Sequence, residues 1–139
     1  MMLARHAENL FWAGRYVERA QDTARALDAT YHHSAGQAPE HAARAWANLL
    51  RSLGLDHAFA ASGRELDVGT VTTFLMGDAG DLGAIGSSVR RARENARSVR
   101  ELLSSELFEA FNHSYLELRA SQRRSLRGGF HEAPADRYA

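Results

Sequence analysis

The sequence lacks cysteine and lysine, two residue types that carry much of protein chemistry. Without cysteine the chain can form no disulfide, thiolate zinc site, iron–sulfur cluster or cysteine nucleophile. Without lysine it has neither a Schiff-base amine nor the lysine of a phosphate-binding loop. All 17 basic residues are therefore arginines, whose guanidinium groups stay charged and match planar carboxylates.

Net charge is also absent, because 17 acidic residues balance the arginines. A general nucleic-acid binder needs surplus positive charge to release phosphate counterions, so we expect no nucleic-acid partner. No apolar run approaches the roughly 20 residues of a membrane helix, so we expect no membrane partner and a cytoplasmic protein. The length of 139 residues is typical of a single domain.

The chain has only 2 prolines, and its apolar residues recur at the spacing of amphipathic helices. Residues 3–31 predict one long helix and residues 87–118 a second. Shorter helices are expected at 40–53, around 58–60 and at 68–76. The expected buried stripe of the first helix is rich in small residues and comprises Leu3, Ala7, Leu10, Gly14, Val17, Ala20, Ala24 and Leu27. The predicted fold is all-α, a helical bundle built on two long helices with shorter helices between them.

Gly128, Gly129 and Pro134 stand among arginines at the end of the chain, which predicts a flexible tail over residues 119–139 after a helical domain over residues 1–118. No Glu-x-x-His pair of the kind used by di-iron bundles occurs in the sequence. Glu106, Glu109 and His113 share one helix face, but a metal would need a matching second set. We therefore expect no metal and no cofactor.

Both predicted long helices carry charged residues opposite their apolar stripes. On the first helix these are Glu8, Arg15, Glu18, Arg19 and Asp22, with Trp12 and Tyr16 beside them. On the last they are Arg90, Arg93, Glu94, Arg97, Arg100 and Glu101. One interpretation is solvated ion pairs within each helix, worth about 0.3–0.5 kcal/mol each. The other is that the two faces meet in an interior polar network shielded by the two aromatic residues, where losing one partner would cost about 3–5 kcal/mol.

Two ordered blocks of sequence carry a resemblance to a known family. The first block contains Ala7-Glu8-Asn9-Leu10-Phe11-Trp12, Gly14-Arg15-Tyr16 and Glu18-Arg19-Ala20. The second contains Ala92-Arg93-Glu94-Asn95-Ala96-Arg97, Val99-Arg100-Glu101 and Phe108-Glu109 with Asn112. Both resemble the bacterial alpha-E domain family, named for its all-helical fold and its Glu-containing motif. The resemblance implies that residues 1–118 form an alpha-E-like domain, shortened relative to the usual family domain.

The resemblance also implies partners, because family members are generally encoded beside, or fused to, ATP-grasp proteins and transglutaminase-like peptidases. The implied setting is the synthesis or modification of peptide or amide bonds. The motif residues and their neighbours are the candidate site, with no catalytic role assigned. They are Glu8, Asn9, Trp12, Arg15, Tyr16, Glu18, Arg19, Arg93, Glu94, Asn95, Arg97, Arg100 and Glu101.

Three functions remain open on the sequence. The first is a noncatalytic accessory or interaction domain that works with an ATP-grasp ligase or a transglutaminase-like protein. The second is a ligand-binding or catalytic domain of the same pathway, with Glu18 or Glu94 as acid or base and arginines holding a carboxylate or phosphate. The third is a self-associating structural module, which predicts a homodimer.

Overall fold

The computed structural model describes residues 2–77 and 85–127, and within these ranges the chain is helical with no strand. The elements are α1 (Met2–Ser34), α2 (Pro39–Ser52), α3 (Asp56–Ala61), α4 (Val68–Met76), α5 (Ile85–Ser98), a 3-10 turn η1 (Arg100–Leu102) and α6 (Ser105–Arg127). The prediction of an all-α bundle with short helices between long ones is therefore confirmed.

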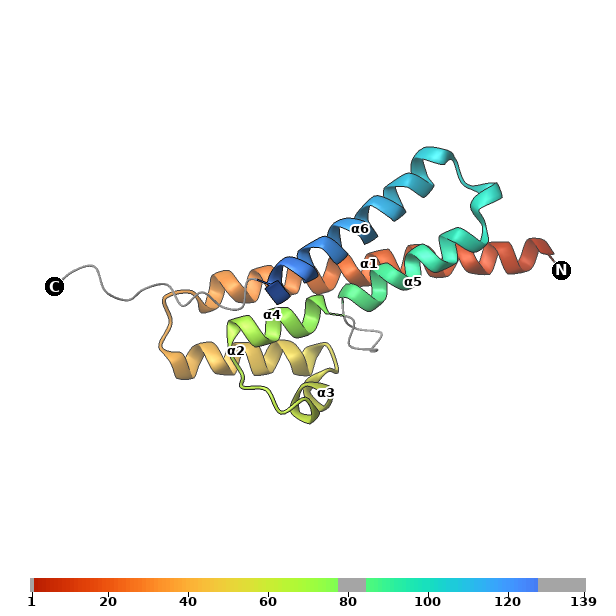
Figure 1. Cartoon of the computed structure of the whole chain (residues 1–139). Helices are drawn as coiled ribbons and strands as arrows, with labels where there is room; N and C mark the ends of the chain where they lie inside the picture. The colour runs from red at the N-terminus through yellow and green to blue at the C-terminus, as the bar shows by residue number, and fades with distance from the viewer. Residues whose placement is uncertain (1, 78–84, 128–139) are drawn as a thin grey trace.

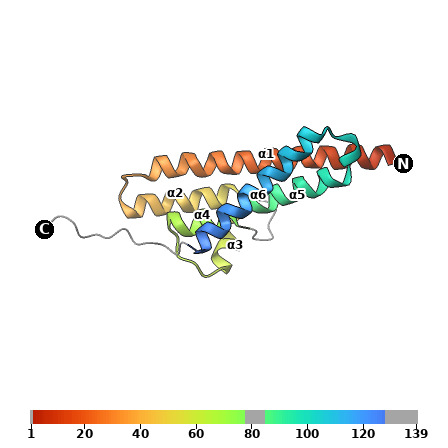
Figure 2. The same cartoon turned by 45° about the horizontal axis from the view of Figure 1, so that its top comes forward.

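The long helix α1 forms the spine of an elongated molecule (Figure 1). Helix α5 lies along the N-terminal half of α1 and α2 along its C-terminal half, and both contacts appear in the two views (Figures 1 and 2). Helix α6 returns from the end of α5 and lies obliquely across the other helices. The two halves of α1 thus belong to two different packing regions.

Local sequence signals explain where the short helices begin and end. Helix α2 starts at Pro39 and ends at Ser52, and Gly54 just beyond it has a φ of 70°, the left-handed conformation that glycine adopts without strain. The Leu55 N–H donates to the Leu50 carbonyl at 2.8 Å, which closes a Schellman motif. Helix α4 begins with a capping box, in which the Asp67 carboxylate accepts from the Thr70 N–H at 2.8 Å. This cap secures a helix in a β-branched segment whose propensity alone leaves helix and strand close.

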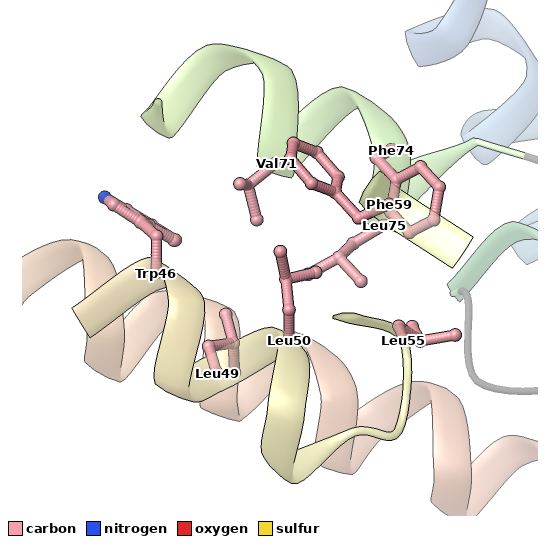
Figure 3. Packing of buried hydrophobic residues seen from close by; sticks show 8 residues of the cluster. All are labelled: Trp46, Leu49, Leu50, Leu55, Phe59, Val71, Phe74 and Leu75. Carbon is pink, nitrogen blue, oxygen red and sulfur yellow. The ribbon is translucent and has the colours of Figure 1, made fainter. Parts of the chain in front are cut away.

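The apolar core lies under the C-terminal half of α1, where α2, α3 and α4 meet (Figure 3). Trp46, Leu50, Val71 and Leu75 are almost completely buried there. The rings of Phe59 and Phe74 pack edge to face, with centroids 5.2 Å apart. This cluster of large side chains anchors the short helices to one another and to α1.

The contact between α1 and α5 is built differently, from small residues. On α1 the buried residues of this region are Ala13, Ala20 and Thr23, and on α5 they include Ala92 and Ala96. The face of α1 that contacts α5 is therefore shifted from the predicted stripe by about one residue along the sequence. The residues along it, spaced alternately by three and four, are His6, Asn9, Ala13, Tyr16, Ala20 and Thr23.

The predicted stripe of α1 is consequently only partly correct. Ala20 is buried, and Val17 and Leu27 are half-buried, as expected. Leu3, however, is 87% exposed and Leu10 39% exposed. The reason is steric, because short side chains let two helix backbones approach more closely than a row of leucines does.

The prediction of a second long helix is also wrong, because residues 87–118 do not form one continuous helix. Helix α5 stops at Ser98, and the chain turns back through η1 into α6. The Ser104 hydroxyl caps the new helix by accepting from the Leu107 N–H at 3.2 Å. Helix α6 continues past 118 to Arg127, and the rest of the predicted tail, 128–139, lies outside the described residues.

Candidate functional site

The charged residues of the first motif lie on the surface of α1. The Arg15 guanidinium pairs with the Glu18 carboxylate at 3.2 Å within the same helix, and both side chains are more than half exposed. Arg19 is exposed beside them. Its backbone carbonyl accepts from the Thr23 hydroxyl at 2.8 Å. Here the structure has the solvated intrahelical pair and not an interior network.

Aromatic side chains lie beside these charged residues on α1. The rings of Trp12 and Tyr16 lie 6.0 Å apart, and Phe11 meets Trp12 edge to face at 5.5 Å. The Arg91 guanidinium of α5 lies 5.9 Å from the centre of the Tyr16 ring. Tyr16 is half-buried, so it fills the edge of the contact between α1 and α5.

The arginines of the second motif connect α5 to α6. The Arg93 Nε–H donates to the Asn112 Oδ1 at 3.0 Å, and its guanidinium lies 4.4 Å from the centre of the Tyr115 ring. Arg100 sits in the same way over Phe108, at 4.6 Å. Two arginines seven residues apart thus meet two aromatic rings seven residues apart, and they hold the hairpin together through stacking and one hydrogen bond.

The interior polar network, the second of the two interpretations, does not form, since no ion pair joins α1 to α5 within residues 2–34 and 85–98. Glu94 and Arg97 are exposed on α5, while Arg93 points to α6. Burying these charges between α1 and α5 would carry a desolvation cost that a seam of alanines avoids. Arg97 and Glu101 do not lie on consecutive turns of one helix, because α5 ends between them.

The remaining predicted site residues are distributed over both helices. On α1, Glu8 is exposed and Asn9 half-buried. On α5, the Asn95 side-chain amide donates to the Arg91 carbonyl at 2.9 Å. Glu101 is exposed on η1.

Phe108 and Asn112 belong to the second motif block, but neither they nor Tyr115 are among the predicted site residues. Their shared face on α6, together with the seven-residue spacing of Arg93 and Arg100, is the signal that could have identified these contacts. This matched spacing indicates a contact only if the chain turns back between the two sets of residues.

Neither Glu18 nor Glu94 lines any of three hollows found among residues 2–77 and 85–127. An apolar groove of about 310 Å³ lies between α1, α5 and α6, with Val17, Val89 and Phe111 in its walls. Two others, of about 390 and 550 Å³, flank α2. Among the described residues, no three metal-ligating side chains come together, and His113 of the predicted acidic face pairs with Glu117 at 3.2 Å.

A shifted pKa is found away from the motif residues, at the start of α6. The pKa of Glu106 is lowered, first by the hydrogen bond from its own backbone N–H and then by that from the Ser104 hydroxyl. Both interactions stabilise the carboxylate form at the helix N-terminus. This shift has a structural cause, the capping of α6.

Comparison with known proteins identifies the family. Residues 2–137 match the Alpha-E family, described as a predicted alpha-helical domain with a conserved ER motif. A search of curated proteins and one of solved structures each find no match. No helix among the described residues is long and apolar enough to cross a membrane. Glu18–Arg19 is the only Glu-Arg pair in the sequence and lies within the matched residues, and we refer to this pair as the ER motif. The chain belongs to the Alpha-E family.

Proposed function

We propose that this chain is a noncatalytic interaction domain that binds a protein partner through the ER motif on α1. The observation that carries the proposal is that Glu18 and Arg19 are exposed and take no part in packing the helices together. A family motif whose side chains point into solvent is available for binding, whereas a structural motif is normally buried.

The surface around the motif has the composition of a binding hot spot. We define the ER face as Trp12, Arg15, Glu18 and Arg19, which share one side of α1. Tryptophan and arginine are the residues most enriched at energetically important interface positions. Arg19 makes no side-chain hydrogen bond or ion pair within the described ranges, so its guanidinium can hold a partner carboxylate through two hydrogen bonds.

The family resemblance supports a particular class of partner, an ATP-grasp ligase or a transglutaminase-like protein that makes or modifies peptide or amide bonds. In this assignment the partner performs the chemistry and the helical domain positions it. The cytoplasm, which supplies ATP, is the compartment that such a ligase requires. A catalytic role for Glu18 or Glu94 is less well supported, because neither carboxylate lines the described hollows.

The test is binding between the purified full chain and an ATP-grasp protein encoded beside it, measured by isothermal titration calorimetry. Arg19→Ala and Glu18→Ala should each weaken binding at least about tenfold, the effect expected of a hot-spot residue.

The chain offers a matched control in the second acid–base pair of the same helix. Asp22 and Arg25 pair at 2.6 Å and are equally exposed. Asp22→Ala and Arg25→Ala should leave both binding and thermal stability unchanged. If all four variants bind alike, the ER face is not the docking surface. If the wild-type proteins do not bind each other, the proposed partner class is wrong.

A further inference from the structure

An apolar face of α1 lies outside the contact with α5. It consists of Leu3, Ala7, Leu10, Gly14 and Val17, spaced by four and three residues, and we call it the α1 strip. Leu3, Ala7, Leu10 and Gly14 are all exposed. A carbon atom added to Gly14 would meet nothing within 4 Å, so the space beside the strip is open. The strip holds no charged residue. Beyond Val17 the helix becomes more polar, beginning with Glu18.

The C-terminal end of the strip opens into the apolar groove. Val17 belongs to both, and Gln21 of the next turn also lines the groove, with Leu107 and Phe111 of α6 on the opposite wall. Figures 1 and 2 show that the N-terminal end of α1 projects past the turn between α5 and α6. The molecule therefore has an exposed apolar end of α1, which begins at Leu3, and an apolar groove that begins at Val17 of the same helix.

We propose that the α1 strip is the interface of a homodimer in which two α1 helices pack antiparallel. Helices with this spacing pair in layers, each layer formed by one residue from each chain. In one antiparallel register Leu10 lies opposite Gly14 of the partner subunit, and Val17 opposite the partner's Ala7. Leu3 then lies opposite Gln21 of the partner subunit, beside the partner's groove. Each layer of the strip pairs a large apolar side chain with a smaller or polar one, so the two surfaces are complementary to themselves.

The exposed area agrees with what a dimer of ordinary size requires. Leu3 and Leu10 are joined at the edges of the strip by Phe11, 60% exposed, and Leu107, 47% exposed. With about 200 Å² for a large side chain, these four residues expose about 470 Å² together. A standard interface covers about 800 Å² per partner, about 60% of it apolar. Because the strip carries no charge, two copies meet without repulsion. The two-fold arrangement also closes on itself and leaves no strip exposed for further chains.

The dimer goes beyond the proposed function, since it uses a different face of α1 from the ER face. Sedimentation velocity of the full chain between about 1 and 100 µM should show a monomer–dimer equilibrium in the micromolar range. Leu10→Glu places a charge in the interface and should weaken the dimer at least about 100-fold. The matched control is Leu116→Glu, at a leucine of α6 that is 54% exposed away from the strip, and it should leave the equilibrium unchanged.

The absence of cysteine allows a direct test of the register, because introduced thiols are the only ones present. Ala7→Cys and Val17→Cys chains, mixed and oxidised, should form a disulfide-linked dimer. Each variant alone should form little, since the proposed antiparallel register places neither residue 7 nor residue 17 opposite its own copy.

Three results would overturn the proposal. They are a monomer at every concentration, equal effects of Leu10→Glu and Leu116→Glu, and cross-linking of the single variants that equals that of the mixture. Arg19→Ala should not change the dimer, so failure of the docking proposal and failure of this one are distinguishable.

Discussion

Gly86, in the first turn of α5, lies against the backbone at the end of α4. A Cβ atom placed there would lie 2.6 Å from the Gly77 carbonyl oxygen and 2.8 Å from that of Met76. Both atoms belong to the backbone at the end of α4, so they cannot rotate away as a side chain would. Gly86→Ala gains about 0.5–1 kcal/mol of helix propensity, but overpacking of this kind costs about 1–3 kcal/mol or more. We expect a net loss of about 2 kcal/mol in the free energy of unfolding, because the clash with fixed backbone lies at the upper end of that range.

The same substitution at Gly14 is the internal control. Its added methyl group meets nothing within 4 Å, so Gly14→Ala should stabilise the monomer by about 0.5–1 kcal/mol. Urea unfolding followed by the fluorescence of buried Trp46, at concentrations low enough to keep the chain monomeric, measures both. The two changes should have opposite signs. If Gly86→Ala proves as stabilising as Gly14→Ala, the close approach of α4 and α5 does not exist in solution.

Three further predictions concern the core, the hairpin and the cap of α6. Leu50→Ala should lower the free energy of unfolding by about 2–5 kcal/mol in urea titrations, because Leu50 is almost fully buried in the α2–α4 cluster. Arg93→Lys should cost about 1 kcal/mol in the same assay, since lysine cannot restore the Nε–H bond to Asn112, whereas the same change at an exposed arginine should cost nothing measurable. Carbon-13 NMR titration should place the pKa of Glu106 below the usual 4.5, and Ser104→Ala should raise it. Because the folded pKa is lowered, the contribution of Glu106 to stability should be present above its unfolded pKa and lost as the pH falls through the folded one.

The short helices were predictable because residues near their ends carry local signals. Gly54 stops α2 in the structure as it does in the sequence pattern, since its positive φ needs no tertiary support. The helix predicted at 68–76 forms although the segment is rich in β-branched residues, and the Asp67–Thr70 capping box supplies the local reason. Signals of this kind involve residues a few positions apart, so a single sequence contains them in full.

The reversal between α5 and α6 was not predicted, because the apolar periodicity continues across it. Val99 and Leu103 remain in phase with the residues on either side, and neither glycine nor proline marks the turn. The only local signal is Ser104, which caps α6. For the same reason Arg100 and Glu101 were placed on a long helix although they lie on η1, and the contacts of the motif residues were not predicted. Whether Arg93 meets α1 or α6 depends on where the chain turns, and side-chain spacing within one helix does not contain that information.

Helix α1 shows why a prediction from hydrophobicity alone misplaced the N-terminal part of its buried face. It carries two neighbouring stripes with the same three-and-four spacing, one built around Leu3 and Leu10 and the other around Ala13 and Ala20. The first is more apolar and was predicted to be buried, but the second contacts α5, because small side chains permit the closest approach between two helices. The more apolar stripe is consequently left in water in the monomer, at a cost of about 25 cal/mol for each Å² that a partner could cover. A helix with two such stripes is built for two neighbours. Since α5 supplies only one beside the N-terminal half of α1, the exposed stripe is itself an argument that this half of the helix binds a second helix.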